Sequence, residues 1–217
     1  MLNGLQDIQT WSIISIEVNK ADRHKKGSFL TQGLKNLKTV GTFTRSSSYL
    51  CKEIVRQIKW TDGQIILELG AGDGVITKFL LDKMGPHSKL IAFEINEVFL
   101  ETLKGIKDDR LIVISQDASQ IQSVLKDLGY MELDHVVSAI PFVILPQQAA
   151  MQIIQTCYDV MVLEGKFIQV HYSLLAKKLY ERIFGAVEIK FVPFNIPPAF
   201  LLIMRKSLVN LSSTTVA

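Results

Sequence analysis

A strand-like hydrophobic run ends abruptly in a cluster of glycines, and residues 65–74 read IILELGAGDG. Glycine is needed where the backbone turns tightly and a ligand approaches it closely. The spacing is GxGxG, not the GxGxxG of dinucleotide sites, and the acids Glu68 and Asp73 would repel a pyrophosphate. The pattern therefore predicts a strand, a glycine loop and a helix that bind a ligand with a cationic end.

Beyond this loop, apolar runs alternate with segments of helical period, which predicts βαβ units and a mostly parallel sheet. The expected strands are Ile65–Leu69, Leu90–Glu94, Leu111–Ser115, His135–Ala139 and Lys166–His171. The expected helices are Val75–Met84, Glu97–Ile106, Ser119–Leu128, Gln147–Met161 and Ser173–Phe184. Two last strands, Val187–Val192 and Phe200–Met204, leave no room for a crossover helix, so we expect them to pair antiparallel. The fold class is therefore α/β, with a seven-stranded sheet that ends in an antiparallel hairpin.

One further helix is expected before the sheet, where residues 46–48 are three serines that can cap it. Its apolar residues, Leu50, Ile54 and Ile58, recur at helical spacing.

Composition sets the class of protein. The chain has 217 residues, 48% of them hydrophobic, which suits one hydrophobic core. No apolar run reaches the length of about 18 residues that a membrane-spanning helix needs. Two cysteines give no disulfide framework, and four histidines show no ligand spacing, so we expect a reduced cytosolic setting and no metal site.

Two more acids follow the next two strands. Glu94 closes the second strand, 20 residues after Gly74, where a carboxylate can accept both hydroxyls of a ribose. Asp117 follows the third strand, where it can take an adenine amino group. Because the carboxyl ends of neighbouring parallel strands share one edge of a sheet, we expect these acids and the glycine loop to meet in one crevice.

Taken together, these features resemble the S-adenosylmethionine-dependent class I methyltransferases over residues 60–205. The resemblance implies a Rossmann-like fold and S-adenosylmethionine as cofactor. It assigns the cofactor contacts to Glu68, Gly70, Ala71, Gly72, Asp73, Gly74, Glu94, Ile95, Asp117, Ala118 and Ser138. A Rossmann-like domain that binds another nucleotide is the alternative.

The loop after the fourth strand separates two kinds of amino-methylating enzyme. In ribosomal RNA adenine dimethylases this loop has an Asn before a Leu/Ile-Pro-aromatic triplet, and its carbonyl accepts from the target amine; here that position is Ala139. The sequence at 138–141, SAIP, is instead similar to the SGLP-like loop of bacterial phospholipid N-methyltransferases. Residues 28–48 and the turn FNIPPA at 194–199 also resemble that family. We therefore disfavour the RNA enzyme, also because the chain beyond residue 205 is too short for a separate RNA-binding domain.

The phospholipid resemblance implies methylation of a lipid amine, with phosphatidylethanolamine and its methylated forms as the leading substrates and an ornithine-type aminolipid close behind. It assigns substrate contacts to Ile140, Pro141 and Asn195, and it carries a catalytic role over to Tyr172. His171, from its titration range, and Tyr49, in the helix before the first strand, are further candidates for handling the amine proton. For both His171 and Tyr172, the alternative to a catalytic role is a role in packing. A cofactor-binding module without catalysis is the alternative from another class.

The amino-terminal segment is strongly basic: residues 20–45 carry seven lysines and arginines against Asp22 alone. Its apolar residues Phe29, Leu30, Leu34 and Leu37 lie at helical spacing, so we expect this helical arm to lie on an anionic membrane. A solvated helix packed on the core and a nucleic-acid patch are the alternatives, the latter disfavoured by sparse aromatic residues.

The expected division is an arm at 1–45, a methyltransferase domain at 46–206 and a flexible tail at 207–217. The lipid resemblance implies a cytoplasmic protein held peripherally at the inner face of the membrane, in an oligomeric state that the sequence leaves open.

Overall fold

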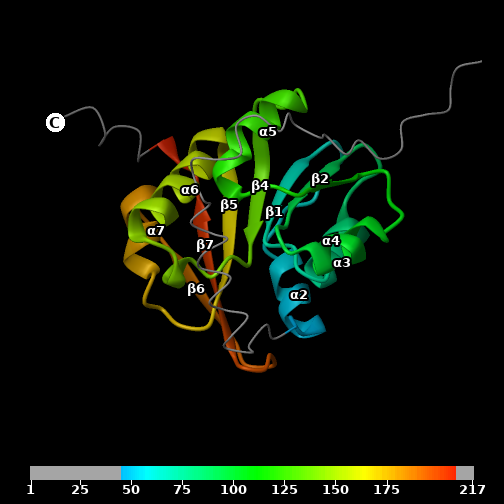
Figure 1. Cartoon of the computed structure of the whole chain (residues 1–217). Helices are drawn as coiled ribbons and strands as arrows, with labels where there is room; N and C mark the ends of the chain where they lie inside the picture. Colours follow the sequence, from blue (N-terminus) through cyan, green and yellow to red (C-terminus); the bar gives the residue numbers. More distant parts are fainter. Residues whose placement is uncertain (1–44, 209–217) are drawn as a thin grey trace, which may run out of the picture.

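In the computed structural model, which describes residues 45–208, seven strands form a single sheet in the order β3-β2-β1-β4-β5-β7-β6 (Figure 1). The strands are β1 (Ile65–Leu69), β2 (Lys89–Phe93), β3 (Leu111–Ile114), β4 (Leu133–Ser138), β5 (Met161–His171), β6 (Glu188–Val192) and β7 (Ala199–Arg205). Strands β1 to β5 are parallel, whereas β7 pairs antiparallel with both β5 and β6. This confirms the predicted α/β class and the antiparallel hairpin at the end of the sheet.

Helices cover both faces of the sheet, so the domain has three layers (Figure 1). The helices are α2 (Ser48–Val55), α3 (Val75–Lys83), α4 (Glu97–Lys104), α5 (Ile121–Asp127), α6 (Gln147–Val160) and α7 (Lys177–Phe184), with short 3₁₀ turns η2 (Ala118–Gln120) and η3 (Phe142–Ile144). Helices α2 and α3 pack on one face, and α5, α6 and α7 pack on the other. Within the described residues, no helix is long and apolar enough to span a membrane.

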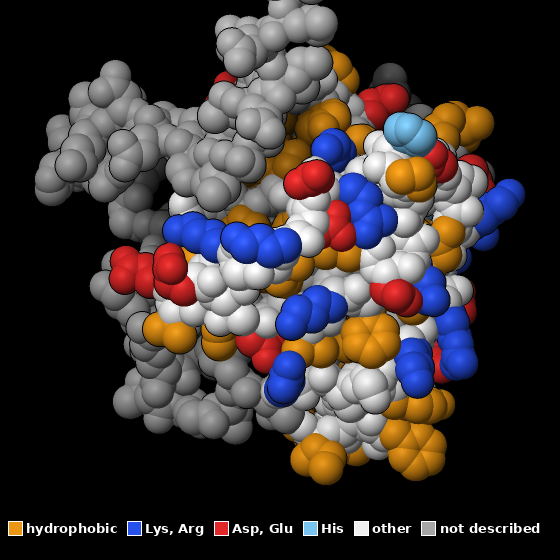
Figure 2. Space-filling view, turned by 90° about the vertical axis from the view of Figure 1, so that its right-hand side faces the viewer, with side chains coloured by type: hydrophobic (Ala, Val, Ile, Leu, Met, Phe, Trp, Pro, Cys, Tyr) orange, Lys and Arg blue, Asp and Glu red, His pale blue; other side chains and the backbone are white. Residues whose placement is uncertain are grey.

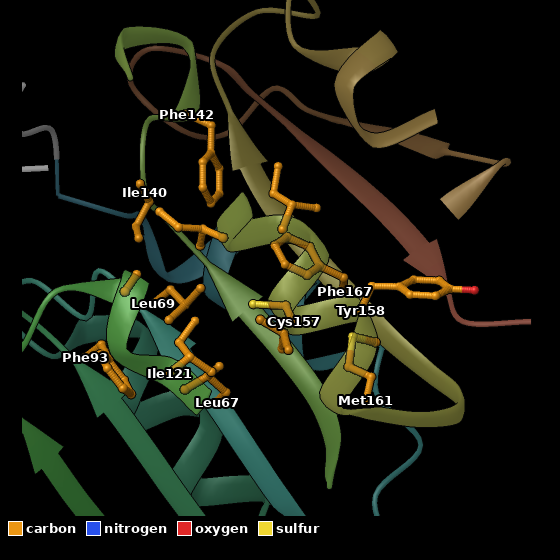
Figure 3. Packing of buried hydrophobic residues seen from close by; sticks show 14 of the residues in the cluster. Leu67, Leu69, Phe93, Ile121, Ile140, Phe142, Cys157, Tyr158, Met161 and Phe167 are labelled. Atoms are coloured by element: carbon orange, nitrogen blue, oxygen red, sulfur yellow. The ribbon is translucent and has the colours of Figure 1, made fainter. Parts of the chain in front are cut away.

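Alternation along the strands divides the core between the two faces. Leu67 and Leu69 of β1 face α5 and α6, whereas Ile66 faces α2 and α3. Figure 3 shows the first of these clusters, in which Ile140 and Phe142, from the loop after β4, join the packed side chains around Leu69 and Phe167. Burial on both faces explains why these strands read as continuous apolar runs in the sequence. The loop after β4 is therefore anchored in the core.

Several boundaries differ from the expected ones, because tertiary contacts set them. Strand β5 begins at Met161, not Lys166, since Met161 pairs with Leu133 of β4 and the Glu164 amide donates to the carbonyl of Lys206, just beyond β7, at 2.9 Å. Helix α7 begins at Lys177, not Ser173, because residues 172–176 form a turn closed by the Lys177 amide on Leu174. The expected helix 119–128 is split into η2 and α5. The other ends agree with the expected ones or shift by one or two residues.

The helix before the sheet is confirmed as α2, whose N-cap is Ser47, the middle one of the three serines. Ile58 is buried although it lies beyond the end of α2. The basic arm lies outside the described residues except for Arg45, and so does most of the predicted tail. The division of the chain into arm, domain and tail therefore stays a prediction.

Candidate functional site

The sheet reverses its strand order at β1, whose neighbours are β2 on one side and β4 on the other. In open α/β sheets, ligands bind outside the carboxyl ends of the strands at such a switch point. The carboxyl ends of β1, β2 and β4 carry the glycine loop, Glu94 and the 138–141 loop. The predicted residues are thus brought to one edge of the sheet, which lies at the bottom of Figure 1.

The glycine loop joins β1 to α3 in a conformation that requires glycine. Gly70, Gly72 and Gly74 all have positive φ values, of 73°, 56° and 78°. A Cβ on Gly70 would lie 3.3 Å from the Ile140 side chain, so the glycine loop packs directly against the loop after β4. A Cβ on Gly72 would meet none of the described atoms within 4 Å. The backbone at Gly72 is therefore the part of the loop that a ligand can approach.

Glu94 connects the end of β2 to this loop. Its carboxylate is 8% exposed and accepts the Gly72 amide at 2.7 Å and the amides of Ile95 and Asn96 at 2.8 Å each. Backbone donors thus hold the carboxylate beside Gly72, and since they occupy three of its roughly four acceptor positions, one position is left on Oε2. A fixed carboxylate in this position can accept a hydroxyl group of a ligand.

Glu68 lies beneath the loop, in β1, and is 2% exposed. Its Oε2 accepts from the Thr77 hydroxyl at 2.7 Å, and Oε1 has no hydrogen-bond partner among the described residues. Burial, which outweighs the Thr77 hydrogen bond and is reinforced by the charge of Glu94, raises the pKa of Glu68 to about 8. The carboxyl group is therefore mostly protonated at neutral pH, and a cation brought close to it would favour the ionised form.

The remaining predicted contacts lie at the ends of β3 and β4. Asp117 caps η2 by accepting the Ser119 amide at 2.8 Å, and Ala118 beside it is buried. Ser138 is buried, and its hydroxyl accepts from the Ile140 amide at 3.3 Å across the turn that leads to Pro141. These residues shape the loops after β3 and β4 at the same edge of the sheet.

Gln169 is a residue that sequence reasoning missed. It is fully buried in β5 beside Ser138 of β4, and its Nε2 donates to the Ile140 carbonyl at 2.9 Å. The Gln169 side chain therefore fixes the loop after β4 from the neighbouring strand β5. The available signal was a glutamine in the middle of an otherwise apolar buried strand, since buried polar groups need partners.

Tyr49, Tyr172 and Asn195 come from three distant segments and belong to one connected cluster. Asn195 is 2% exposed; its Oδ1 accepts the Ser47 amide at 2.9 Å, and its amide hydrogen bonds with Tyr172. The rings of Tyr49 and Phe194 meet edge to face, with centroids 5.1 Å apart. Burial raises the pKa of Tyr172 despite the hydrogen bond with Asn195, so its hydroxyl stays protonated at neutral pH. The cluster offers neutral hydroxyl and amide groups beside exposed aromatic rings.

His171 takes a different position. It is 3% exposed, and its Nε2 lies 2.8 Å from the Tyr180 hydroxyl in the core beneath α7. Burial lowers its pKa to about 4, so the imidazole is neutral over the physiological range. The structure thus separates His171 from Tyr172, and this placement favours the packing alternative for His171.

A short segment before α2 connects the glycine loop to the tyrosine cluster. The Nε of Arg45 lies 2.9 Å from Oδ2 of Asp73. Two residues further along the chain, the backbone amide of Ser47 donates to the side-chain carbonyl of Asn195. The Ser47 hydroxyl also donates to the Phe194 carbonyl at 2.7 Å. Residues 45–47 therefore run along the carboxyl edge from one half of the candidate site to the other, a link that sequence reasoning did not predict.

In the part of the chain that the structure describes, no cluster of His, Cys, Asp and Glu is suited to hold a metal ion.

The residues present fit S-adenosylmethionine: an open glycine backbone, a fixed carboxylate for a ribose hydroxyl, and a buried carboxyl group with an unpartnered oxygen among the described residues for a cationic end. The fold and this site define a class I S-adenosylmethionine-dependent methyltransferase. A family model described as ribosomal RNA adenine dimethylase matches residues 41–190, and the chain belongs to this family.

Relatives and solved structures agree with this class. The chain is 29% identical over 174 residues to an ornithine lipid N-methyltransferase of Singulisphaera acidiphila, covering 79% of this chain and 91% of that protein. The fold is similar to precorrin-6y C5,15-methyltransferase of Geobacter metallireducens, with a TM-score of 0.61, 14% identity and coverage of 76% and 92% of the two chains. It is also similar to an S-adenosylmethionine-dependent O-methyltransferase of Thermotoga maritima, with a TM-score of 0.56, 16% identity and coverage of 82% and 71%.

Proposed function

We propose that this methyltransferase transfers methyl groups to the amine of an aminolipid, with ornithine lipid and phosphatidylethanolamine as the two acceptors to distinguish. The observation that carries the proposal is Ala139, which stands at the carboxyl end of β4 where a base-methylating loop would offer a carboxamide acceptor. The similarity to an ornithine lipid N-methyltransferase supports the same class of acceptor.

In this proposal the residues around the glycine loop hold the cofactor. Glu94 would accept a ribose hydroxyl, the Gly72 backbone would lie against the ligand, and Glu68 would face the cationic amino-acid end. Asp117 and Ala118 would flank the base, with Ile95 and Ser138 beside the cofactor. When bound, S-adenosylmethionine supplies an electrophilic methyl group for an incoming lone pair.

The proposed acceptor site lies beside the tyrosine cluster. An aliphatic ammonium must lose its proton before its nitrogen can accept a methyl group, and water takes this proton as the amine enters. Because the pKa of Tyr172 is raised, its hydroxyl orients the neutral amine through a hydrogen bond and does not act as a phenolate base. Tyr49, Pro141 and Asn195 shape the entrance, and positioning supplies most of the rate enhancement.

The test is transfer of labelled methyl from S-adenosylmethionine to three acceptors in parallel: ornithine lipid vesicles, phosphatidylethanolamine vesicles and structured RNA. We expect labelled mono-, di- or trimethylated lipid and unlabelled RNA. A Glu94→Gln variant, assayed alongside, shows that the label comes from this protein. The absence of label in both lipids would overturn the proposal.

Adenine methylation in RNA is the second candidate, and membership of the ribosomal RNA adenine dimethylase family favours it. The family model matches residues 41–190, most of the expected methyltransferase domain at 46–206, which would hold the cofactor in either case. Labelled RNA together with unlabelled lipid would select this second candidate.

We further propose that the lipid reaction takes place at the inner face of an anionic membrane, to which the basic arm contributes charge.

A further inference from the structure

The carboxyl edge of the sheet carries a group of exposed hydrophobic side chains. They come from three loops that are far apart in the sequence: the loop after β4, the loop after β5 and the turn between β6 and β7. We call this group the apolar rim; its members are Val143, Ile144, Leu174, Leu175, Phe194 and Ile196. In Figure 2, hydrophobic side chains stand out at the lower end of the molecule, where the β6–β7 turn lies in Figure 1.

Two members of the rim are the most exposed large hydrophobic side chains among the described residues. Leu175 is 87% exposed and Ile196 is 84% exposed, and both stand at the tips of their loops. Isolated exposed leucines are normal on a protein surface, whereas apolar residues gathered at one edge mark an interaction site. Tyr49 packs against Phe194 of the rim, and Tyr172 lies two residues before Leu174 and beside Asn195, so a surface that covers the β6–β7 turn and the loop after β5 also lies next to the proposed acceptor site.

Basic residues border the rim. Lys177 and Lys178 directly follow Leu175 and Ala176, and Lys177 forms an ion pair with Glu181. On the other side, Arg45 lies at the edge beside Asp73 and joins the domain to the basic segment 20–45. Apolar loop tips beside lysine and arginine complement an anionic bilayer, whose acyl region takes the tips and whose headgroups attract the charges.

From this arrangement we infer that the apolar rim docks the domain onto an anionic lipid bilayer and inserts its loop tips around the entrance of the site. This inference rests on the proposed function, because an aminolipid that stays in its bilayer must meet the site at the membrane surface. The rim then determines the orientation of the domain, so that headgroups face Tyr172 while acyl chains remain in the bilayer.

The test compares two double variants of the full chain. Leu175→Ser with Ile196→Ser removes the two most exposed rim residues, neither of which belongs to the proposed acceptor site. Met131→Ser with Leu163→Ser removes exposed apolar side chains just before β4 and near the start of β5, at the opposite edge of the sheet. Each variant is measured for cosedimentation with phosphatidylcholine vesicles, with and without phosphatidylglycerol. Methyl transfer to a short-chain aminolipid dispersed as monomers reports whether the fold and the chemistry are intact.

We expect the rim variant to bind the anionic vesicles at least about tenfold more weakly than the wild type, because two aliphatic side chains no longer enter the bilayer. The opposite-edge variant should bind within about twofold of the wild type, as surface substitutions usually do. Both variants should methylate the monomeric lipid at the wild-type rate.

Unchanged vesicle binding by the rim variant would overturn the inference, and so would an equal loss in both variants. If residues 1–44 or a protein partner cover the rim instead, the rim variant would bind vesicles at least as well as the wild type, which also overturns it. The proposed function fails separately: the wild type would then label no lipid, even though vesicle binding depends on the rim.

Discussion

The side-chain carbonyl of Asn195 accepts a hydrogen bond from the Ser47 amide at 2.9 Å, across 148 positions of the sequence. Asn195 also donates to the Pro197 carbonyl at 2.8 Å and hydrogen bonds with Tyr172. One buried amide thus connects the start of α2, the β6–β7 turn and the loop after β5. This connection holds the tyrosine cluster together at the carboxyl edge of the sheet.

Asn195→Ala should lower the free energy of unfolding by about 2–3 kcal/mol, because it breaks the hydrogen bonds to the Ser47 amide and the Pro197 carbonyl and removes a buried side chain. Urea denaturation measures this change. Asn96→Ala is the control: Asn96 caps α4 through the Val98 amide at an exposed position, and losing that cap costs about 1 kcal/mol. Equal losses in the two variants would show that Asn195 does not have the connecting role described here.

Tyr172→Phe should reduce methyl transfer to lipid by about tenfold to a hundredfold, since the amine loses the hydroxyl that orients it. Cofactor affinity, measured by calorimetry with S-adenosylhomocysteine, should not change. Tyr130→Phe, between α5 and β4, is the matched control and should retain full activity. An unchanged rate in Tyr172→Phe would leave Tyr172 with a packing role only.

Glu94→Gln should weaken cofactor binding by about tenfold to a hundredfold, because hydrogen bonds to a charged acceptor contribute about 1.5–3 kcal/mol each. The substitution keeps the shape of the side chain while removing the charge beside Gly72. Glu97→Gln, in the first turn of α4, serves as the control and should bind the cofactor normally. Equal affinities in both variants would argue against a ribose contact at Glu94.

Gly72→Ala separates the backbone role of the glycine loop from its ligand role. Gly63→Ala is a closely matched control, since both glycines have positive φ, of 56° and 81°, and a Cβ at either position meets none of the described atoms within 4 Å. Each variant should lose about 1 kcal/mol of stability from the left-handed backbone. Only Gly72→Ala should also lose cofactor affinity, by about tenfold or more, because its methyl group lies where the ligand would contact the backbone. Equal affinity in the two variants would place the cofactor elsewhere.

Glu68 should make the stability of the fold depend on pH. Its pKa is about 8 in the folded chain against the ordinary value of 4.5, so between these values the folded state holds a proton that the unfolded state has lost. Glu68 therefore lowers the free energy of unfolding as pH rises through this window, by up to about 1.4 kcal/mol per pH unit, whereas the lowered pKa of His171 raises it up to about pH 6.5, so the net fall is expected from pH 6.5 to pH 8. Glu68→Gln should remove this fall, and urea denaturation from pH 6.5 to pH 8 measures it. Glu132→Gln, at an exposed carboxylate, should keep the wild-type slope; a wild-type slope in Glu68→Gln would contradict the buried, protonated state.

The sequence by itself determined the α/β class, the mostly parallel sheet and the glycine loop of this methyltransferase. These features follow from local patterns: apolar strands buried on both faces, helical periodicity between them, and glycines at backbone positions with positive φ. The positions of Glu94 and Asp117 could be predicted for the same reason, because each follows a strand whose carboxyl end must reach a shared edge.

Only the tertiary structure decided which side chains meet beyond those local patterns. His171 and Tyr172 are neighbours in the sequence, yet His171 bonds Tyr180 in the core whereas Tyr172 joins Asn195 at the edge. Local periodicity does not encode a partner more than a hundred residues away, so the Ser47–Asn195 bond was absent from the prediction. The hold of Gln169 on the Ile140 carbonyl likewise depends on the pairing of β4 with β5. Side-chain partners of this kind are chosen by the packing of the whole chain, because a buried polar group bonds whichever donor or acceptor the fold brings beside it.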